Sequence, residues 1–241
     1  MPREARVVAV GLPHHITQRG NARQDVFITD SLRRAYLRLL SQYSITHRLR
    51  VLGYCLMTNH VHIVAIPETD SSMANTFRHA HGRFSQYWNT EQKRSGHLWQ
   101  NRYYSCAVEE AAVGRVIAYV EKNPVRAGMV KYAEDFEWSS ARAHLGHVTD
   151  GPTQPRNLDD EWWQVRWTAP EWKETLLNLS DQEHESRAIR EATYTGRPLG
   201  SQAFVADLGE KLGRELGTRP GGRPKRDLDR AANQLALWAI R

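Results

Sequence analysis

The order of apolar and polar residues along the chain predicts a small mixed fold. The third of its predicted strands alternates clearly between apolar and polar positions, and Thr58-Asn59 before it is a tight turn. The segments predicted as strands are 14–18, 49–57, 60–66 and 99–108.

Apolar residues at helical spacing predict three helices between and after these strands. Their starts are marked by capping or acidic residues, at Thr29 or Asp30, at Ser71 or Ser72, and at Glu109 or Glu110. Pro124 ends the third helix, because proline cannot continue the helical hydrogen bonds. The succession is βαββαβ with an added helix, which predicts an α+β fold with an open antiparallel sheet and helices on one face.

The character of the sequence changes after Gly146. Residues 147–157 are rich in Gly, Pro and Asp and suit a linker, and further helices are expected near 171–177, after Ser201 and at 228–240. We therefore predict a main domain at 1–146, a linker at 147–160 and a mainly helical, basic C-terminal region at 161–241.

The composition indicates what kind of partner the protein binds and in which cellular compartment it is found. The 241 residues carry 33 Lys and Arg against 27 Asp and Glu, and this formal charge of +6 favours a polyanionic partner such as nucleic acid. Two cysteines form no disulfide framework, which favours a reducing cytosol. Because no apolar run suits a signal peptide or a membrane helix, we expect a soluble, cytoplasmic protein that needs no membrane.

The pair His60 and His62 is the first candidate for chemistry. Residues i and i+2 of a strand point to the same face, so the two imidazoles project together while Val61 enters the core. Two neutral imidazoles suit a divalent metal and leave most of its coordination shell open. The alternative is a chance His-x-His on a solvated sheet face, since the chain has 11 histidines.

The helix that follows residue 109 carries the second candidate. Its buried stripe is expected to be Val113, Val116, Ile117 and Val120. Tyr119 and Asn123 are four residues apart and share another face, so a phenol and an amide oxygen point to one place. Tyr119 could act as a nucleophile while Asn123 completes a metal shell or steers the substrate. Alternatively, Tyr119 lies at the rim of an amphipathic helix and Asn123 only ends it.

Several motifs together resemble one family. They are QRGN at 18–21, MTNHVH at 57–62, YVEKNPVRAG at 119–128, WSS at 138–140, TGRPLG at 195–200 and GRP at 222–224. In this order they resemble the REP-associated tyrosine transposases, which are relatives of the small single-tyrosine HUH transposases of the IS200-like superfamily. His-x-His alone is unspecific, whereas its combination with YxxxNPxRAG is highly specific. The resemblance is weakest from 147 to 191.

The resemblance implies a ferredoxin-like HUH domain that cuts single-stranded DNA beside hairpins of repetitive extragenic palindromes (REP). Tyr119 would be the nucleophile, forming a 5′-phosphotyrosine, and His60, His62 and Asn123 would hold Mg²⁺ or Mn²⁺. The partner would be single-stranded or hairpin DNA in a bacterial-type, nucleoid-associated setting, and residues 161–241 would bind DNA. The close family suggests a monomer acting in cis, while the smaller relatives leave a dimer open.

Basic and aromatic residues extend the predicted DNA surface. Phosphate contacts are expected from Arg19, Arg23, Arg78, Arg83, Arg102 and Arg126, and from a minor-groove hook at Arg223, Lys225 and Arg226. Base stacking is expected from Tyr87, Trp88, Trp99, Tyr103 and Tyr104. For each of these residues, a solvated arginine or a core aromatic is the competing interpretation.

Three alternatives to an active enzyme of this family stay open. One is a hairpin-binding protein that has lost catalysis, although the trio His60, His62 and Tyr119 is intact. A second is a structural zinc protein that uses Cys55 and Cys106, whose spacing fits no zinc motif. A third is a replication initiator or relaxase. Tyr103 and Tyr104 are rival nucleophiles, and no general base is identified.

Overall fold

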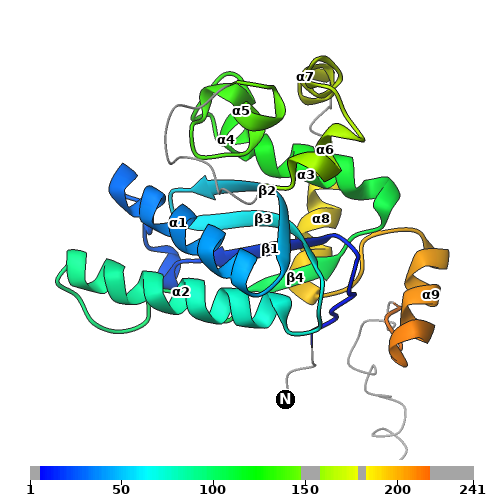
Figure 1. Ribbon diagram of the computed structural model, residues 1–241, viewed down its shortest axis with the longest axis horizontal. Helices are drawn as coiled ribbons and strands as arrows, with labels where there is room; N and C mark the ends of the chain where they lie inside the picture. Colours follow the sequence, from blue (N-terminus) through cyan, green and yellow to red (C-terminus); the bar gives the residue numbers. More distant parts are fainter. Residues whose placement is uncertain (1–5, 148–157, 179–182, 218–241) are drawn as a thin grey trace, which may run out of the picture.

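A four-stranded antiparallel sheet forms the centre of the molecule (Figure 1). The computed structural model describes residues 6–147, 158–178 and 183–217. The strands are β1 (His14–Arg19), β2 (Leu49–Met57), β3 (His60–Pro67) and β4 (Tyr104–Ala107). Their order in the sheet is β2-β3-β1-β4. This order and the βαββαβ succession confirm the predicted α+β, ferredoxin-like fold.

Two long helices, α1 (Asp30–Thr46) and α2 (Ser72–Glu91), pack together on one face of the sheet. The Thr29 hydroxyl accepts a hydrogen bond from the Leu32 amide, so α1 begins at a predicted capping residue. An aromatic cluster fills the space between the helices and the sheet. Its members are Phe27, Tyr36, Phe77, Phe84 and Trp99.

The opposite face is covered by α3 (Val113–Glu121) and α8 (Glu183–Thr195). A short 3-10 turn (Glu110–Ala112) precedes α3, and the expected stripe of valines and isoleucine is buried. The chain continues beyond Pro124 as a short helix, α4 (Asn123–Arg126). Proline is tolerated in the first turn of a helix, where its missing N–H has no partner in any case. The third helix ends at Glu121, three residues before its predicted end at Pro124, and Pro124 itself lies in the first turn of α4.

The remaining described helices gather above the sheet in Figure 1, except α9, which stands at its side. They are α5 (Ala141–His144), α6 (Asp160–Gln164), α7 (Ala169–Asn178) and α9 (Gln202–Leu212), with a 3-10 turn at Ala133–Asp135. α7 and α9 agree with the expected helices, and Ser201 caps α9 as predicted. Most of the predicted linker and the expected helix at 228–240 lie outside the described residues, and the three-part division of the chain stays a prediction.

The sheet edges carry short additional pairings. Cys55 of β2 bridges Ser139, and Val51 bridges Leu158. At the other edge, Val108 bridges Leu199 just beyond β4. The fourth strand is shorter than predicted because the chain bends at 100–102 and the Trp99 ring packs with the aromatic cluster. In the described part of the chain, no helix has both the length and the apolar character to cross a membrane.

Candidate active site

The histidine pair and Tyr119 meet in one pocket of about 780 Å³, on the face of the sheet that α3 and α8 cover. The ring centroids of His60 and His62 are 4.9 Å apart. The Tyr119 ring lies edge-on to His62 at 5.9 Å and to His15 at 5.9 Å. Strand alternation thus places the two histidines together as expected, and α3 brings the tyrosine of the same chain against them.

A chain of hydrogen bonds fixes the tautomer of His62. The Thr193 hydroxyl donates its single proton to the Ile189 carbonyl at 2.7 Å, so it must accept from His15 Nδ1 at 2.6 Å. His15 Nε2 is then unprotonated and accepts from His62 Nδ1 at 2.9 Å. The result is that His62 presents its Nε2 lone pair away from this chain of bonds.

His60 reaches the same state through a local contact. Its Nδ1 lies 2.7 Å from the side-chain oxygen of Asn59, which can only accept, so Nδ1 carries the proton and Nε2 the lone pair. Burial, followed by the charge of Arg19, lowers the pKa of His60 to about 4. Burial, with the nearby charges of His60 and other groups, holds the pKa of His62 well below its usual value. Both imidazoles are therefore neutral at pH 7, as metal ligands must be.

The Tyr119 side chain is 4% exposed and is held by Arg126. The guanidinium of Arg126 lies 4.2 Å from the centroid of the Tyr119 ring and donates to the Tyr119 carbonyl at 2.6 Å. The Asn123 amide nitrogen donates to the carbonyls of Tyr119 and Val120 at 3.0 and 3.1 Å. These bonds leave the Asn123 side-chain oxygen as an acceptor beside the pocket, which Asn123 lines.

The QRGN segment forms a tight turn at the mouth of the pocket. A Cβ on Gly20 would lie 2.5 Å from the Gln24 carbonyl oxygen, so the turn requires glycine there. Arg23 adopts a left-handed conformation with φ 61, and its carbonyl accepts from the Asn59 side chain at 3.2 Å. The turn thereby presents Arg19 and Arg23 to the pocket, which both line.

The predicted DNA-binding residues divide into three groups. Arg19, Arg23 and Arg126 line the pocket, whereas Arg102 lines a neighbouring one. The structure does not bring Arg78 and Arg83 to the pocket, because both are exposed on α2 at the opposite face of the sheet. The hook residues Arg223, Lys225 and Arg226 lie outside the described residues.

Most of the predicted stacking aromatics have structural roles instead. Trp88 is buried and donates through its indole N–H to the Val26 carbonyl. Tyr103 packs on Phe77 at 4.8 Å, on the α2 side of the sheet. Of the five aromatics, Tyr104 alone lines the pocket, and its ring stacks on Tyr194 at 5.0 Å.

Helix α8 supplies pocket residues that the sequence did not suggest. They are Arg187, Arg190, Glu191, Thr193 and Tyr194. His15 was also missed, although its position two residues before Thr17 on β1 places it on the same sheet face as His62. The buried residues of α8, Ser186, Ile189 and Thr193, do have helical spacing. Only Ile189 is strongly apolar, so an apolar pattern does not predict this helix.

The donors present fit a divalent metal with an open coordination shell. Two imidazole Nε2 atoms are unprotonated, and the Asn123 oxygen is a further acceptor at the same pocket. Over residues 6–147, 158–178 and 183–217, no group of three or more His, Cys, Asp or Glu side chains could hold a metal. The structural-zinc alternative therefore finds no site in that part of the chain, where Cys55 and Cys106 are buried free thiols.

Comparison with known proteins identifies the class to which this arrangement belongs. Residues 9–123 match the family described as "Transposase IS200 like", so this segment is an IS200-like transposase domain. The chain also resembles, in fold, a solved REP-associated tyrosine transposase bound to a REP hairpin. The identity is 17% and the TM-score 0.50, and the match covers 66% of this chain and 94% of that one. The IS200-like superfamily expected from the sequence motifs is thereby confirmed for residues 9–123.

A second solved structure matches the chain less well. A structure described as a "putative transposase from deinococcus radiodurans r1" matches with 16% identity and a TM-score of 0.36, over 50% of this chain and 97% of that one. No curated protein sequence matches the chain.

Proposed function

We propose that this protein is a metal-dependent endonuclease and strand transferase that acts on single-stranded DNA at REP-type hairpins. The observation that carries the proposal is the contact between Tyr119 and His62, with ring centroids 5.9 Å apart in one chain. Membership of residues 9–123 in the IS200-like transposase family supports DNA processing. The solved relative is bound to a REP hairpin, which supports the same kind of partner here.

In the proposed reaction, the phenol oxygen of Tyr119 attacks a phosphodiester phosphorus. A Tyr–O–P bond forms and the bond to the 3′-oxygen breaks, which leaves a 5′-phosphotyrosine and a free 3′-OH. The proton that the phenol loses is balanced by the one that the leaving oxygen gains. The covalent link preserves the energy of the phosphodiester, so rejoining needs no ATP.

The predicted site residues that line the pocket each have a part in this proposal. His60, His62 and Asn123 would hold Mg²⁺ or Mn²⁺, which when bound polarises the phosphate and stabilises its developing negative charge. Arg126 fixes the Tyr119 ring and backbone. Arg19 and Arg23 would neutralise phosphates at the mouth of the pocket, which both line. Because Tyr119 meets the histidines of its own chain, a monomer that cuts in cis is the simplest form.

The decisive experiment is a cleavage assay on labelled single-stranded hairpins taken from the repeats of the source genome. Wild type, Tyr119→Phe and the matched control Tyr104→Phe are compared with Mn²⁺, with Mg²⁺ and with EDTA. We expect metal-dependent cutting and a covalent protein–DNA adduct in wild type and Tyr104→Phe, and neither in Tyr119→Phe.

Two other outcomes would replace the proposal. An adduct that survives Tyr119→Phe and disappears in Tyr104→Phe would move the nucleophile to β4. Tight hairpin binding without any cutting would instead favour a DNA-binding protein that has kept the fold and lost the chemistry.

A further inference from the structure

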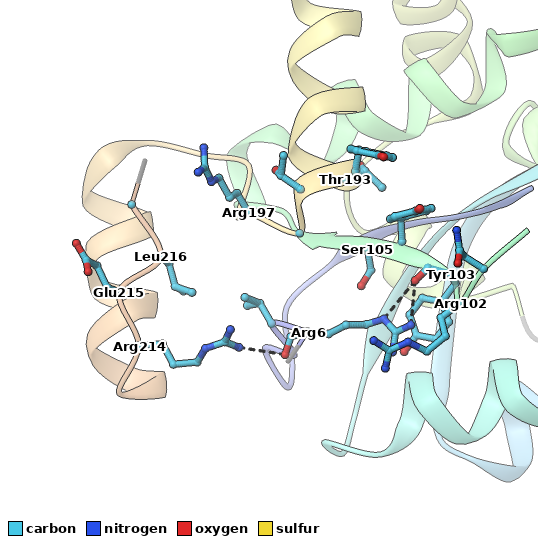
Figure 2. A pocket seen from close by; sticks show the side chains of 16 residues that line it. Arg6, Arg102, Tyr103, Ser105, Thr193, Arg197, Arg214, Glu215 and Leu216 are labelled. Carbon is cyan, nitrogen blue, oxygen red and sulfur yellow. Dashed lines mark hydrogen bonds between the residues drawn. The ribbon is translucent and has the colours of Figure 1, made fainter. Parts of the chain in front are cut away.

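A second basic pocket of about 740 Å³ opens beside the first. It lies between the N-terminal segment, β4, the end of α8 and the turn after α9 (Figure 2). Its cationic lining residues are Arg6, Arg102, Arg197 and Arg214, and its one acidic residue is Glu215. Four guanidinium groups against one carboxylate make the pocket strongly positive, which suits an anionic ligand.

Two of these arginines are available for such a ligand. Among the described residues, neither Arg102 nor Arg197 forms an ion pair or a side-chain hydrogen bond. Arg6 is held in place: its guanidinium donates to the Tyr103 carbonyl at 3.1 and 3.2 Å and lies 3.9 Å from the Tyr103 ring centroid. Arg214 donates to the Arg6 carbonyl at 3.2 Å, which closes the lower side of the pocket in Figure 2.

A buried hydroxyl at the floor of this pocket independently indicates a polar ligand. Ser105 is 3% exposed, and its Oγ has no hydrogen-bond partner. Figure 2 shows the Ser105 side chain projecting from β4 on the side of the pocket where the Arg6 guanidinium lies. An unsatisfied buried hydroxyl costs about 1–3 kcal/mol. A ligand oxygen that accepts its proton would remove that cost.

The two pockets adjoin each other and share part of their walls. Asn101, Tyr104, Thr193 and Tyr194 line both of them. The stacked pair Tyr104–Tyr194 therefore stands at the boundary, and Tyr194 is 70% exposed. Proteins that bind single-stranded nucleic acid commonly use an exposed aromatic ring between two cationic pockets. Bases stack on the ring, and the cations bind the phosphates.

We propose that the pocket of Arg6, Arg102, Arg197 and Arg214 holds backbone phosphates of the single strand that leads away from the cleavage pocket, with a base stacked on Tyr194. This inference rests on the proposed function for the position of the cut. It adds the path of the strand and assigns a binding role to the end of α8.

The test measures binding of the full chain in EDTA, so that no cleavage takes place. Fluorescence anisotropy follows labelled hairpins with single-stranded tails of increasing length, over a range of salt concentrations. The variants are Arg102→Gln/Arg197→Gln, Ser105→Ala and Tyr194→Ala. The matched control is Arg78→Gln/Arg83→Gln, which removes two exposed arginines from the opposite face of the sheet.

For tailed hairpins we expect the Arg102→Gln/Arg197→Gln variant to bind at least tenfold more weakly. Its slope of log affinity against log salt should fall by about 1.4, since each phosphate contact in single strands contributes about 0.7. Tyr194→Ala should weaken binding about tenfold with little change of slope. Ser105→Ala should weaken it by a smaller factor without lowering the melting temperature. Blunt hairpins and the control variant should show wild-type behaviour.

An unchanged slope and affinity in Arg102→Gln/Arg197→Gln would overturn the proposal. A second pair of results would also overturn it: an affinity that does not depend on tail length, and a melting temperature that inorganic phosphate raises in wild type but not in Arg102→Gln/Arg197→Gln. The pocket would then hold a free phosphate. Because these measurements need no metal and no cut, they are separate from the cleavage assay, and either proposal can fail alone.

Discussion

The two histidines of the pocket are oriented by partners at very different distances along the chain. His60 is held by the adjacent Asn59. His62 depends on His15 and, through it, on Thr193, which is 178 residues away from His15 in sequence. Groups behind a metal ligand commonly set its tautomer and change metal affinity 10–100-fold. Thr193 would therefore be a positioning residue for His62.

Thr193→Val tests this dependence. The variant keeps the shape of the side chain and removes the acceptor for His15 Nδ1. We expect the nitrogen chemical shifts of His62 in the metal-free protein to show a mixture of tautomers, and Mn²⁺ affinity measured by calorimetry to fall roughly tenfold or more. Thr195→Val, an exposed change on the same helix, is the control. Wild-type shifts and affinity in Thr193→Val would show that His62 is oriented without α8.

Helix α3 carries Tyr119, and a buried carboxylate anchors the C-terminal end of this helix. Glu121 is fully buried and accepts hydrogen bonds from Ser140 at 2.5 Å, from His144 at 2.6 Å and from the Trp172 indole at 2.8 Å. The His144 ring in turn stacks on Trp163 at 3.4 Å. Segments that follow residues 9–123 thus hold α3 in position.

Glu121→Ala should destabilise the protein by about 3–5 kcal/mol, because it leaves three buried donors without their acceptor. Glu110→Ala is the matched control, since Glu110 forms an exposed ion pair with Arg166 that is worth at most about 1 kcal/mol. Urea unfolding followed by tryptophan fluorescence measures both variants. Equal stability of the two variants would mean that the Glu121 network does not anchor α3.

The elements that sequence patterns predict well are those with a regular apolar face. β2 was predicted to the residue, and α1 begins at a predicted cap. α8 was missed because two of its three buried residues, Ser186 and Thr193, are polar. Thr193 is buried because it forms hydrogen bonds with His15 and Ile189. A pattern of apolar residues cannot predict the burial of such a polar side chain.

The same distinction applies to the candidate site. Strand alternation paired His60 with His62, and helix spacing paired Tyr119 with Asn123, because these rules act over a few residues. That the two pairs share one pocket was implied by the family resemblance, and the structure brings them together. The contribution of His15, α8 and the second basic pocket depends on contacts between distant segments. Arg78 and Arg83 are the opposite case. They are close in sequence to the strands of the site, but α2 places them on the face of the sheet opposite the pocket.

At the scale of the whole molecule, buried neutral histidines predict sensitivity to acid. Burial lowers the pKa of His15 and His81 to about 3 and that of His14 to about 4. The folded state therefore stays unprotonated at these groups while the unfolded chain, with pKa ~6.5, binds protons. Stability is complete above the unfolded pKa and is lost as the pH falls below it, by about 2 kcal/mol for each such histidine at pH 5.

We expect denaturant unfolding to show a large loss of stability between pH 7 and pH 5, with cooperative acid unfolding below. His81→Gln should shift that unfolding to lower pH, since glutamine can still accept from the Tyr36 hydroxyl that contacts His81. His97→Gln, at an exposed position, should not. Stability that stays level from pH 7 to pH 5 would contradict this expectation.

The short pairings along the two sheet borders have a consequence for self-association. An outer strand with unpaired amides and carbonyls invites a strand from another molecule. Here the backbone of β2 already bonds to Trp138, Ser140 and Asp159, and Leu199 occupies the border beyond β4. A second copy would have to displace these segments before the sheet could extend across two molecules. Segments from the C-terminal half of the chain thus hinder continuous β-pairing between copies wherever they occupy the borders of the sheet.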